Sequence, residues 1–211
     1  MLAAHLRHAT AAVHQALEQS ASMAVLLTPD LNRVAYRTHL VRLYGTVTSL
    51  EAGLWAEPGW HLLLGDTADR RKTPWLVQDL ADLGVHDVAV LPCDAIRTPD
   101  TTAQALGVAY VLEGATLGGA IIGKHLRRSA GITPERGGRY YHSYGSERGP
   151  RWLHMQATLD RFGTVHPDAV EEVEQAAATT FAAMHAWMAA SRVGSSRARR
   201  ARAASHVGAR A

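Results

Sequence analysis

One histidine of the twelve in this chain has neighbours that suit a metal ligand. His14 lies in a segment with an apolar face, with Glu18 four residues later and Arg7 seven residues earlier. On a helix the three side chains share one side, with Arg7 about 10 Å from His14. A neutral imidazole is a good iron ligand, a carboxylate on its second nitrogen fixes the tautomer, and a guanidinium pairs with carboxylates. The spacing favours a ligand that carries both a metal and carboxylates, although a solvated surface helix would show the same residues.

The stretch 106–126 is apolar and contains no proline, as in a buried helix, yet it holds five glycines: Gly107, Gly114, Gly118, Gly119 and Gly123. Each glycine inside a helix costs about 1 kcal/mol relative to alanine. Gly107, Gly114 and Gly118 are spaced to share one bare face. Two interpretations follow: close packing of a neighbouring helix, or a helix that bends over a flat ligand. A haem, with an iron and two propionates, would fit between this helix and His14.

The periodicity predicts an all-α protein with six to eight helices around one core. The expected helices cover 3–20, 31–55, 73–83, 98–128 and 150–163, and a last one begins at Pro167. Caps are expected at Asp30, Thr73 and around Thr98. Residues 60–72 predict a loop or short helix, 85–97 a connector with a brief strand as one option, and 129–149 an irregular segment.

Charge and composition divide the chain into a body and a tail. Residues 193–211 are rich in Arg, Ser and Ala and are expected to be disordered, which leaves one domain over 1–192. Six of the 22 basic residues follow residue 190, so the other 16 against 19 acidic residues give residues 1–190 a net charge of about −3. We therefore expect no nucleic-acid binding by the body. The single cysteine, Cys93, the absence of a signal peptide and the lack of a long apolar run predict a cytoplasmic protein without a membrane span. Cys93 itself is expected to be a small buried residue.

Two of these segments resemble the haem-clasping motifs of haem oxygenases. Residues 6–18 (LRHATAAVHQALE) resemble the proximal-helix segment. Residues 110–119 (YVLEGATLGG) resemble the distal-helix segment of the bacterial biliverdin-producing branch. Residues 139–145 (RYYHSYG), Trp152 and the helix around Phe181 are also similar to that branch. The resemblance covers about residues 3–190 and implies a haem oxygenase-like multi-helix bundle, with haem between a proximal and a distal helix.

This resemblance implies a reaction and its partners. Haem b would be both substrate and cofactor, and O₂ activated on its iron would attack a porphyrin meso carbon. The products would be biliverdin, CO and ferrous iron, with electrons from a ferredoxin, a flavodoxin or an NAD(P)H-dependent reductase. Whether a biliverdin-binding photoreceptor takes up the product stays open.

The resemblance also implies roles for single residues. His14 would be the axial ligand and Glu18 would orient it, while Arg7 and Tyr110 would hold the propionates. Gly114, Gly118 and Gly119 would form the distal surface, where the missing side chains leave room for O₂ and water.

The chain departs from the family pattern at two positions. Ala115 stands where animal-type enzymes have an aspartate that organises distal water, a residue that the bacterial branch also often lacks. Ala157 stands where a further propionate-binding arginine is usual, and Arg151 or Arg161 could substitute for it.

Two further groups keep two interpretations each. Lys124, Arg127 and Arg128 at the end of the glycine-bearing helix stabilise the helix dipole, or dock an acidic electron donor. Arg139 with three tyrosines forms a pocket rim, or simply packs the loop; the tyrosines are Tyr140, Tyr141 and Tyr144.

Two other functions compete with haem cleavage. A non-catalytic haem carrier or sensor on the same fold is compatible with the missing distal aspartate, although storage needs no space for O₂. A non-haem relative, such as a thiaminase-like or di-iron enzyme, would need a nucleophilic cysteine or paired Glu and His ligands inside the bundle. Cys93 lies outside the long helices, and the sequence shows no repeated Glu-x-x-His.

Overall fold

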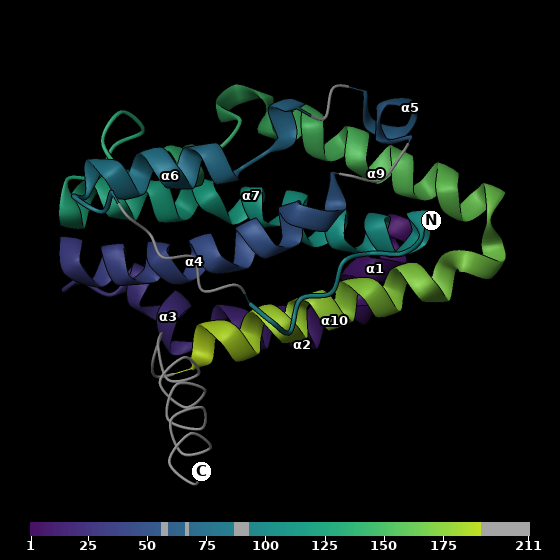
Figure 1. The fold of residues 1–211 in the computed structure, drawn as a ribbon, viewed down its shortest axis with the longest axis horizontal. Helices are drawn as coiled ribbons and strands as arrows, with labels where there is room; N and C mark the ends of the chain where they lie inside the picture. Colours follow the sequence, from purple (N-terminus) through teal and green to yellow (C-terminus); the bar gives the residue numbers. More distant parts are fainter. Residues whose placement is uncertain (56–58, 66–67, 87–92, 191–211) are drawn as a thin grey trace, which may run out of the picture.

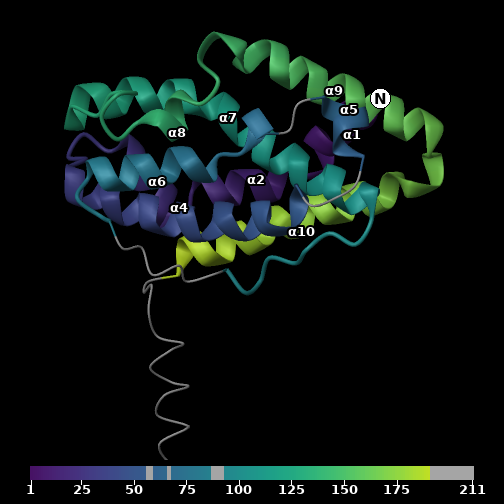
Figure 2. The same cartoon turned by 45° about the horizontal axis from the view of Figure 1, so that its top comes forward.

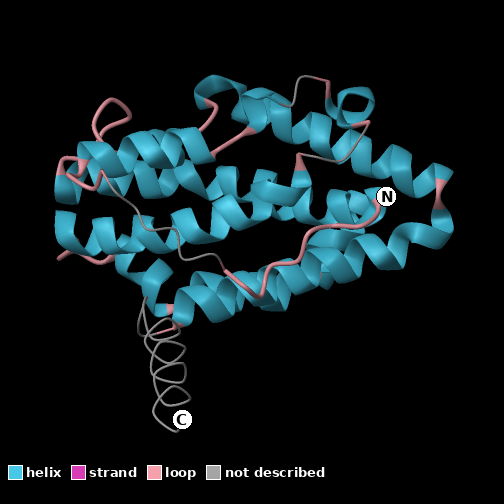
Figure 3. Cartoon of the chain, in the orientation of Figure 1, coloured by secondary structure: helices cyan, strands magenta, loops and turns pink. Residues whose placement is uncertain are grey.

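The computed structural model describes residues 1–55, 59–65, 68–86 and 93–190 (Figure 1). The predicted all-α class is confirmed, because the described part of the chain contains helices, turns and two isolated bridges but no strand (Figure 3). The α-helices are α1 Leu2–Ala9, α2 Ala11–Glu18, α3 Ala21–Ala24, α4 Arg33–Leu54, α5 Trp60–Leu64, α6 Thr73–Asp82, α7 Thr102–Ala130, α8 Arg139–His142, α9 Arg148–Val165 and α10 Val170–Ala189. Short 3₁₀ turns cover Val25–Leu27, Ala68–Arg70, Gly145–Glu147 and Pro167–Ala169.

Helix α7 is the centre of the bundle. It packs most extensively along α10 and also contacts α4, α8 and α9 (Figures 1 and 2). By length and composition alone α7 could cross a membrane, which the sequence analysis did not expect. However, 61% of its most apolar window is buried inside the fold. Its apolar character is therefore accounted for by its place in the core.

The predicted first helix, 3–20, is two helices. The break falls at Thr10, whose φ of −93° and ψ of 0° depart from helical values. Thr10 is buried, and its hydroxyl donates a hydrogen bond of 2.7 Å to the Leu6 carbonyl. A side chain that bonds its own backbone in this way competes with the regular helical pattern. Arg7 therefore lies on α1 and His14 on α2.

Three helix starts differ from the predicted caps. Asn32, not Asp30, caps α4 by accepting bonds from the amides of Val34 and Ala35, each 3.0 Å long. The α7 cap is Thr101 rather than a residue near Thr98.

The start of α6 has no local side-chain cap at all. Instead of Thr73 serving as the cap, the amides of Lys72 and Thr73 donate to the buried carboxylate of Glu51 on α4. A distant residue thus satisfies amides that local sequence left open.

The short segments agree with the sequence only in part. Residues 60–72 contain α5 and a 3₁₀ turn, while the segment expected to be irregular, 129–149, contains α8. Cys93 is buried, as expected. The possible strand within 85–97 and the expected tail fall largely on residues 87–92 and 191–211, which lie outside the described residues.

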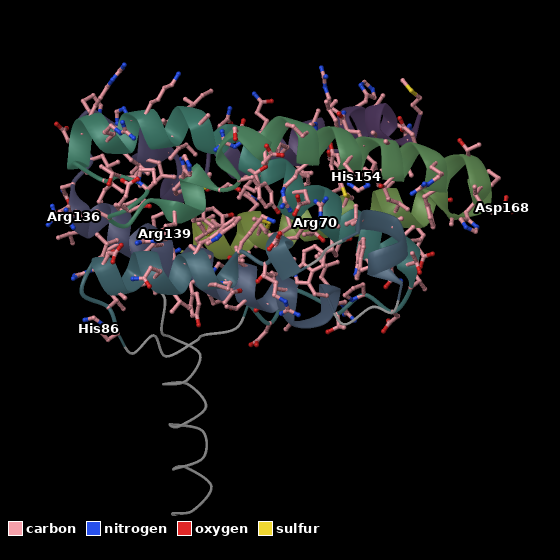
Figure 4. The ribbon with its side chains drawn as sticks, turned by 90° about the horizontal axis from the view of Figure 1, so that it is seen from above. Arg70, His86, Arg136, Arg139, His154 and Asp168 are labelled. Carbon is pink, nitrogen blue, oxygen red and sulfur yellow. The ribbon has the colours of Figure 1, made fainter. Side chains whose placement is uncertain are left out.

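A buried ionic cluster fixes the rotation of α7. Glu113 is 1% exposed and accepts bonds from Arg70 at 2.9 Å and Lys72 at 2.7 Å. The hydroxyl of Tyr144 donates to the same carboxylate at 2.9 Å. Arg70, labelled near the middle of the view in Figure 4, is itself 2% exposed. Because Glu113 is held on this side, the glycine-bearing side of α7 turns elsewhere.

Candidate haem-binding site

The helix that carries His14 and the glycine-bearing helix are joined by a common neighbour. Both α2 and α7 pack against α10, and they contact each other much less than they contact α10. The His14 ring lies edge-on to the ring of Phe181 on α10, with centroids 5.2 Å apart. The side chain of His14 is 48% exposed, so its ring nitrogens are accessible. The Phe181 ring on α10 thus packs against the His14 ring.

The glycines of α7 do not all have the same role. A methyl group on Gly107 would lie 2.5 Å from the Val173 carbonyl of α10. On Gly119 it would lie 2.5 Å from the Tyr141 carbonyl. On Gly118 it would meet nothing within 4 Å. Gly107 and Gly118 are eleven residues apart and share one face, so this face is covered by α10 at one end and open at the other.

The open part of α7 is apolar. Leu117 is 42% exposed and Ile121 is 68% exposed, and Ala115 and Gly118 are also exposed. Contiguous exposed apolar side chains on a core helix mark a binding surface more often than single ones do. Gly114 is the exception on this stretch, because Trp152 lies 3.6 Å from the position of its missing methyl group.

The polar end of the site lies where α1 meets α7. Burial raises the pKa of the buried Tyr110, against the lowering effects of the Thr10 side chain and the positive charge of Arg7. Arg7 is exposed. The positive charge of Arg7 thus acts on Tyr110, while no described contact joins the two side chains.

Glu18 is close to His14 but not bonded to it. The nearest approach, from Nε2 of His14 to Oε1 of Glu18, is 3.9 Å, which is longer than a hydrogen bond. Both side chains are about half exposed. A hydrogen bond between the two side chains would form only if the His14 ring reoriented.

Comparisons with known proteins place this arrangement in a family. The family model described as "Heme oxygenase" matches residues 1–190. The chain belongs to the haem oxygenase family. The comparison with curated protein sequences finds no match.

Two solved haem oxygenases share the fold. The NO- and CO-bound enzyme from Neisseria meningitidis matches with a TM-score of 0.76 and 22% identity, over 89% of this chain and 90% of that one. The enzyme from Leptospira interrogans matches with a TM-score of 0.75 and 20% identity, over 89% and 98%. These likenesses establish the haem oxygenase-like fold predicted from the sequence.

The haem oxygenase motifs leave the second propionate arginine unsettled. Arg151 points to the buried cluster, since its guanidinium carbon lies 4.5 Å from the centroid of the Tyr144 ring and it approaches Asp69 at 3.6 Å. Arg161 and Ala157 are exposed on α9. Neither arginine is joined to Arg7 or Tyr110 by a described contact.

The loop after α7 packs rather than forming a haem pocket rim. Arg139 pairs with Asp82 at 2.5 Å and with Asp79 at 3.4 Å. Tyr140 and Tyr141 are buried, and the Tyr141 hydroxyl is 2.5 Å from Nε2 of His39. For Arg139 and Tyr140 the packing interpretation is therefore the correct one. Tyr141 lines a different cavity, described below.

Three residues of the site were not predicted from the sequence. Phe181 contacts the His14 ring, the Thr10 side chain lowers the pKa of Tyr110, and Trp152 fills the space beside Gly114. One sequence signal was available, since the chain has only two phenylalanines and one of them lies on the last apolar stripe.

A di-iron centre has no candidate ligand set in the described part of the chain. No group of three or more His, Cys, Asp or Glu side chains there could hold a metal ion. Haem needs only one protein ligand from this side, and His14 can supply it.

Proposed function

We propose that this chain is a haem oxygenase that cleaves haem b with O₂ and reductant to biliverdin, CO and ferrous iron. The observation that carries the proposal is the single face of α7 that α10 covers at Gly107 and leaves open at Gly118, together with a histidine on α2, a helix that packs against the same α10. A storage site would be served equally well by side chains at Gly118, whereas an oxygenase needs free space there. When bound, haem supplies the redox-active iron and the porphyrin carbon that is oxidised.

The residues of this chain bind and orient the substrate. We propose that His14 binds the iron through one ring nitrogen and that Phe181 holds the ring upright. Glu18 accepts a bond from the other nitrogen once the ring has turned, which fixes the neutral tautomer. Arg7 and Tyr110 bind a propionate with a charge-assisted bond and a hydroxyl donor.

We propose that the glycines of α7 form the distal surface and keep it free of large side chains. Gly118 leaves space for O₂, while Gly114 lets the Trp152 ring pack against the helix beside that space. Gly119 contributes indirectly, because its missing side chain lets the Tyr141 carbonyl approach α7. Ala115 offers no acid, so ordered water, rather than a side chain at that position, would deliver protons in the open space.

Electrons must come from outside the chain. We propose a ferredoxin, a flavodoxin or an NAD(P)H-dependent reductase as the donor, in the cytoplasm. Whether a photoreceptor receives the biliverdin is a separate question of pathway.

The test is a reconstitution with haemin. The purified protein receives one equivalent of haemin, then a ferredoxin and its reductase, with catalase present to remove free peroxide. We expect stoichiometric binding, followed by loss of the Soret band and growth of the broad red absorption of biliverdin. A complex that is reduced and binds O₂ without losing the macrocycle would instead make the protein a carrier or sensor. Failure to bind haemin would refute both functions.

A further inference from the structure

A cavity lies on the α8 side of α7, separate from the open face at Gly118. Its volume is about 610 Å³, and it is bounded by the C-terminal half of α7, residues 132–138 and the junction of α8 with α9. Gly119 and Tyr141 lie in its wall, so it is on the α8 side of the helix rather than on the open Gly118 face. Sites for small molecules commonly have volumes of roughly 300–1,000 Å³.

The charged residues that line this cavity are all basic. They are Lys124, Arg127, Arg128 and Arg148, with His142 beside them. Among the described residues none of these five side chains has an acidic partner within 4 Å. The exposed Glu135 interacts electrostatically with two of these residues, because its pKa is lowered by its own backbone amide, then by Thr133, and also by Arg127 and His142. One carboxylate does not neutralise this cluster.

The helix dipole explains some of these cations but not all. Arg127 and Arg128 lie in the last turn of α7, where positive charge is favourable. Arg148 is the first residue of α9, where positive charge is unfavourable. Its guanidinium donates to the carbonyls of Tyr141 at 3.3 Å and His142 at 2.6 Å, while its buried Nε has no partner in the described structure. A cation held against the dipole adds positive charge to this cavity that the helix dipoles do not explain.

The interior of the cavity is apolar and has free room. Leu126 and Ile132 are buried in its wall. Gly123 also lines it, and a methyl group there would meet nothing within 4 Å. The cavity thus combines an apolar floor with a basic rim.

We propose that this cavity binds a small aromatic organic anion with at least two negative charges. The ring system would lie over Gly123, Leu126 and Ile132, and the anionic groups would pair with Lys124, Arg128 and Arg148. Guanidinium groups bind phosphate esters and carboxylates with the same geometry, so either group could supply the charge. The site is independent of the proposed haem chemistry, because it opens on another side of α7.

Calorimetric titration with defined probes tests this proposal. ADP and naphthalene-2,6-dicarboxylate are the two anionic probes, adenosine lacks the charge, and inorganic pyrophosphate lacks the ring. The titrations use the haemin-treated protein and are repeated without haemin, so a failure of haem binding does not affect the result. We expect saturable binding of at least one anionic probe, weakening as ionic strength rises. Adenosine should not bind, and pyrophosphate should bind about tenfold more weakly than the probe that carries the ring.

Matched variants locate the binding. Lys124→Glu and Arg128→Glu should each raise the dissociation constant about tenfold or more. Gly123→Leu should abolish binding by filling the cavity, with a thermal unfolding midpoint no lower than that of the parent. Arg37→Glu, an exposed charge reversal on α4 at a residue that does not line the cavity, is the control and should leave binding unchanged.

Three results would overturn the proposal. They are the absence of saturable binding by both anionic probes at low ionic strength, equal binding by the Gly123→Leu variant, and an equal loss in the Arg37→Glu control. Binding of an acidic ferredoxin through Lys124 and Arg128, with no binding of either small anion, would identify a protein-docking surface instead. Binding of ADP alone, or of the dicarboxylate alone, would support the proposal and identify the anionic group.

Discussion

Two adjacent glycines on α7, Gly118 and Gly119, should differ in how an alanine substitution changes the free energy of unfolding. An alanine at Gly118 or at Gly119 gains about 1 kcal/mol of helix propensity in either position. At Gly119 the new methyl group would lie 2.5 Å from the Tyr141 carbonyl oxygen, and such overpacking costs about 1–3 kcal/mol. At Gly118 it meets nothing within 4 Å. Since the propensity gain is common to both, the Gly118→Ala protein should be more stable than the Gly119→Ala protein by about 1–3 kcal/mol.

Urea unfolding of the haem-free proteins measures this difference directly. A third variant, Gly118→Leu, tests function. Its urea midpoint should be at least as high as that of the parent. It should nevertheless lose haem turnover, because the leucine occupies the space proposed for O₂. Equal stability of the two alanine variants would refute the packing difference. Parental turnover by a folded Gly118→Leu protein would refute the assignment of the open face to the substrate.

Three further predictions concern charge and protonation. Arg7→Ala should weaken haemin binding about tenfold in a spectrophotometric titration, because it removes a charged bond to a propionate. The Soret maximum should change little, because the iron ligand is still present. Unaltered affinity would contradict the role of Arg7. His39 has its pKa lowered from 6.5 to about 4 by burial, so the unfolded chain takes up a proton before the folded chain does and stability falls as the pH drops. The loss should be about 2 kcal/mol between pH 7 and pH 5 by urea unfolding and should be absent in His39→Gln; an equal loss in that variant would assign it to other groups. Glu113→Gln should destabilise the protein by about 3–5 kcal/mol, because it leaves the buried Arg70 and Lys72 without their carboxylate; a loss below about 1 kcal/mol would show that the cluster is not held by charge.

The long helices could be predicted because their signals are periodic. Val173, Ala177, Phe181, Met184 and Met188 are spaced at helical intervals, and all of them are buried in α10. Because an apolar stripe of this kind repeats along the whole helix, a single atypical residue does not obscure it. The predicted bounds of the long helices were therefore close to the observed ones.

Features that depend on distant partners were not predictable. The cap of α6 is a carboxylate on α4, and Glu51 is separated from Lys72 by 21 residues. The buried Glu113 pairs with Arg70 and Lys72, which precede it by 43 and 41 residues and gave no local signal. The same limit applies to the break at Thr10, where a threonine that could have continued the helix bonds its own backbone instead.

The glycines show most clearly what a spacing can and cannot tell. The sequence placed Gly107 and Gly118 on one face and left two interpretations, helix packing or ligand approach. The structure confirms helix packing at Gly107, which α10 covers, and leaves the same face open at Gly118, where ligand approach stays a prediction. The face of a helix can be deduced from its sequence, whereas the length over which a neighbour covers it is a property of the tertiary fold.

The most direct test of haem cleavage at this site is the stoichiometry of CO release. The haem-loaded protein is given ferredoxin, reductase and O₂ with catalase present, and the CO released is trapped and compared with the haem lost. We predict one CO for each haem lost in the parent protein, and neither CO nor biliverdin from His14→Ala loaded with the same amount of haemin. Haem loss without CO, or equal CO from His14→Ala, would contradict an oxygenase that works through His14.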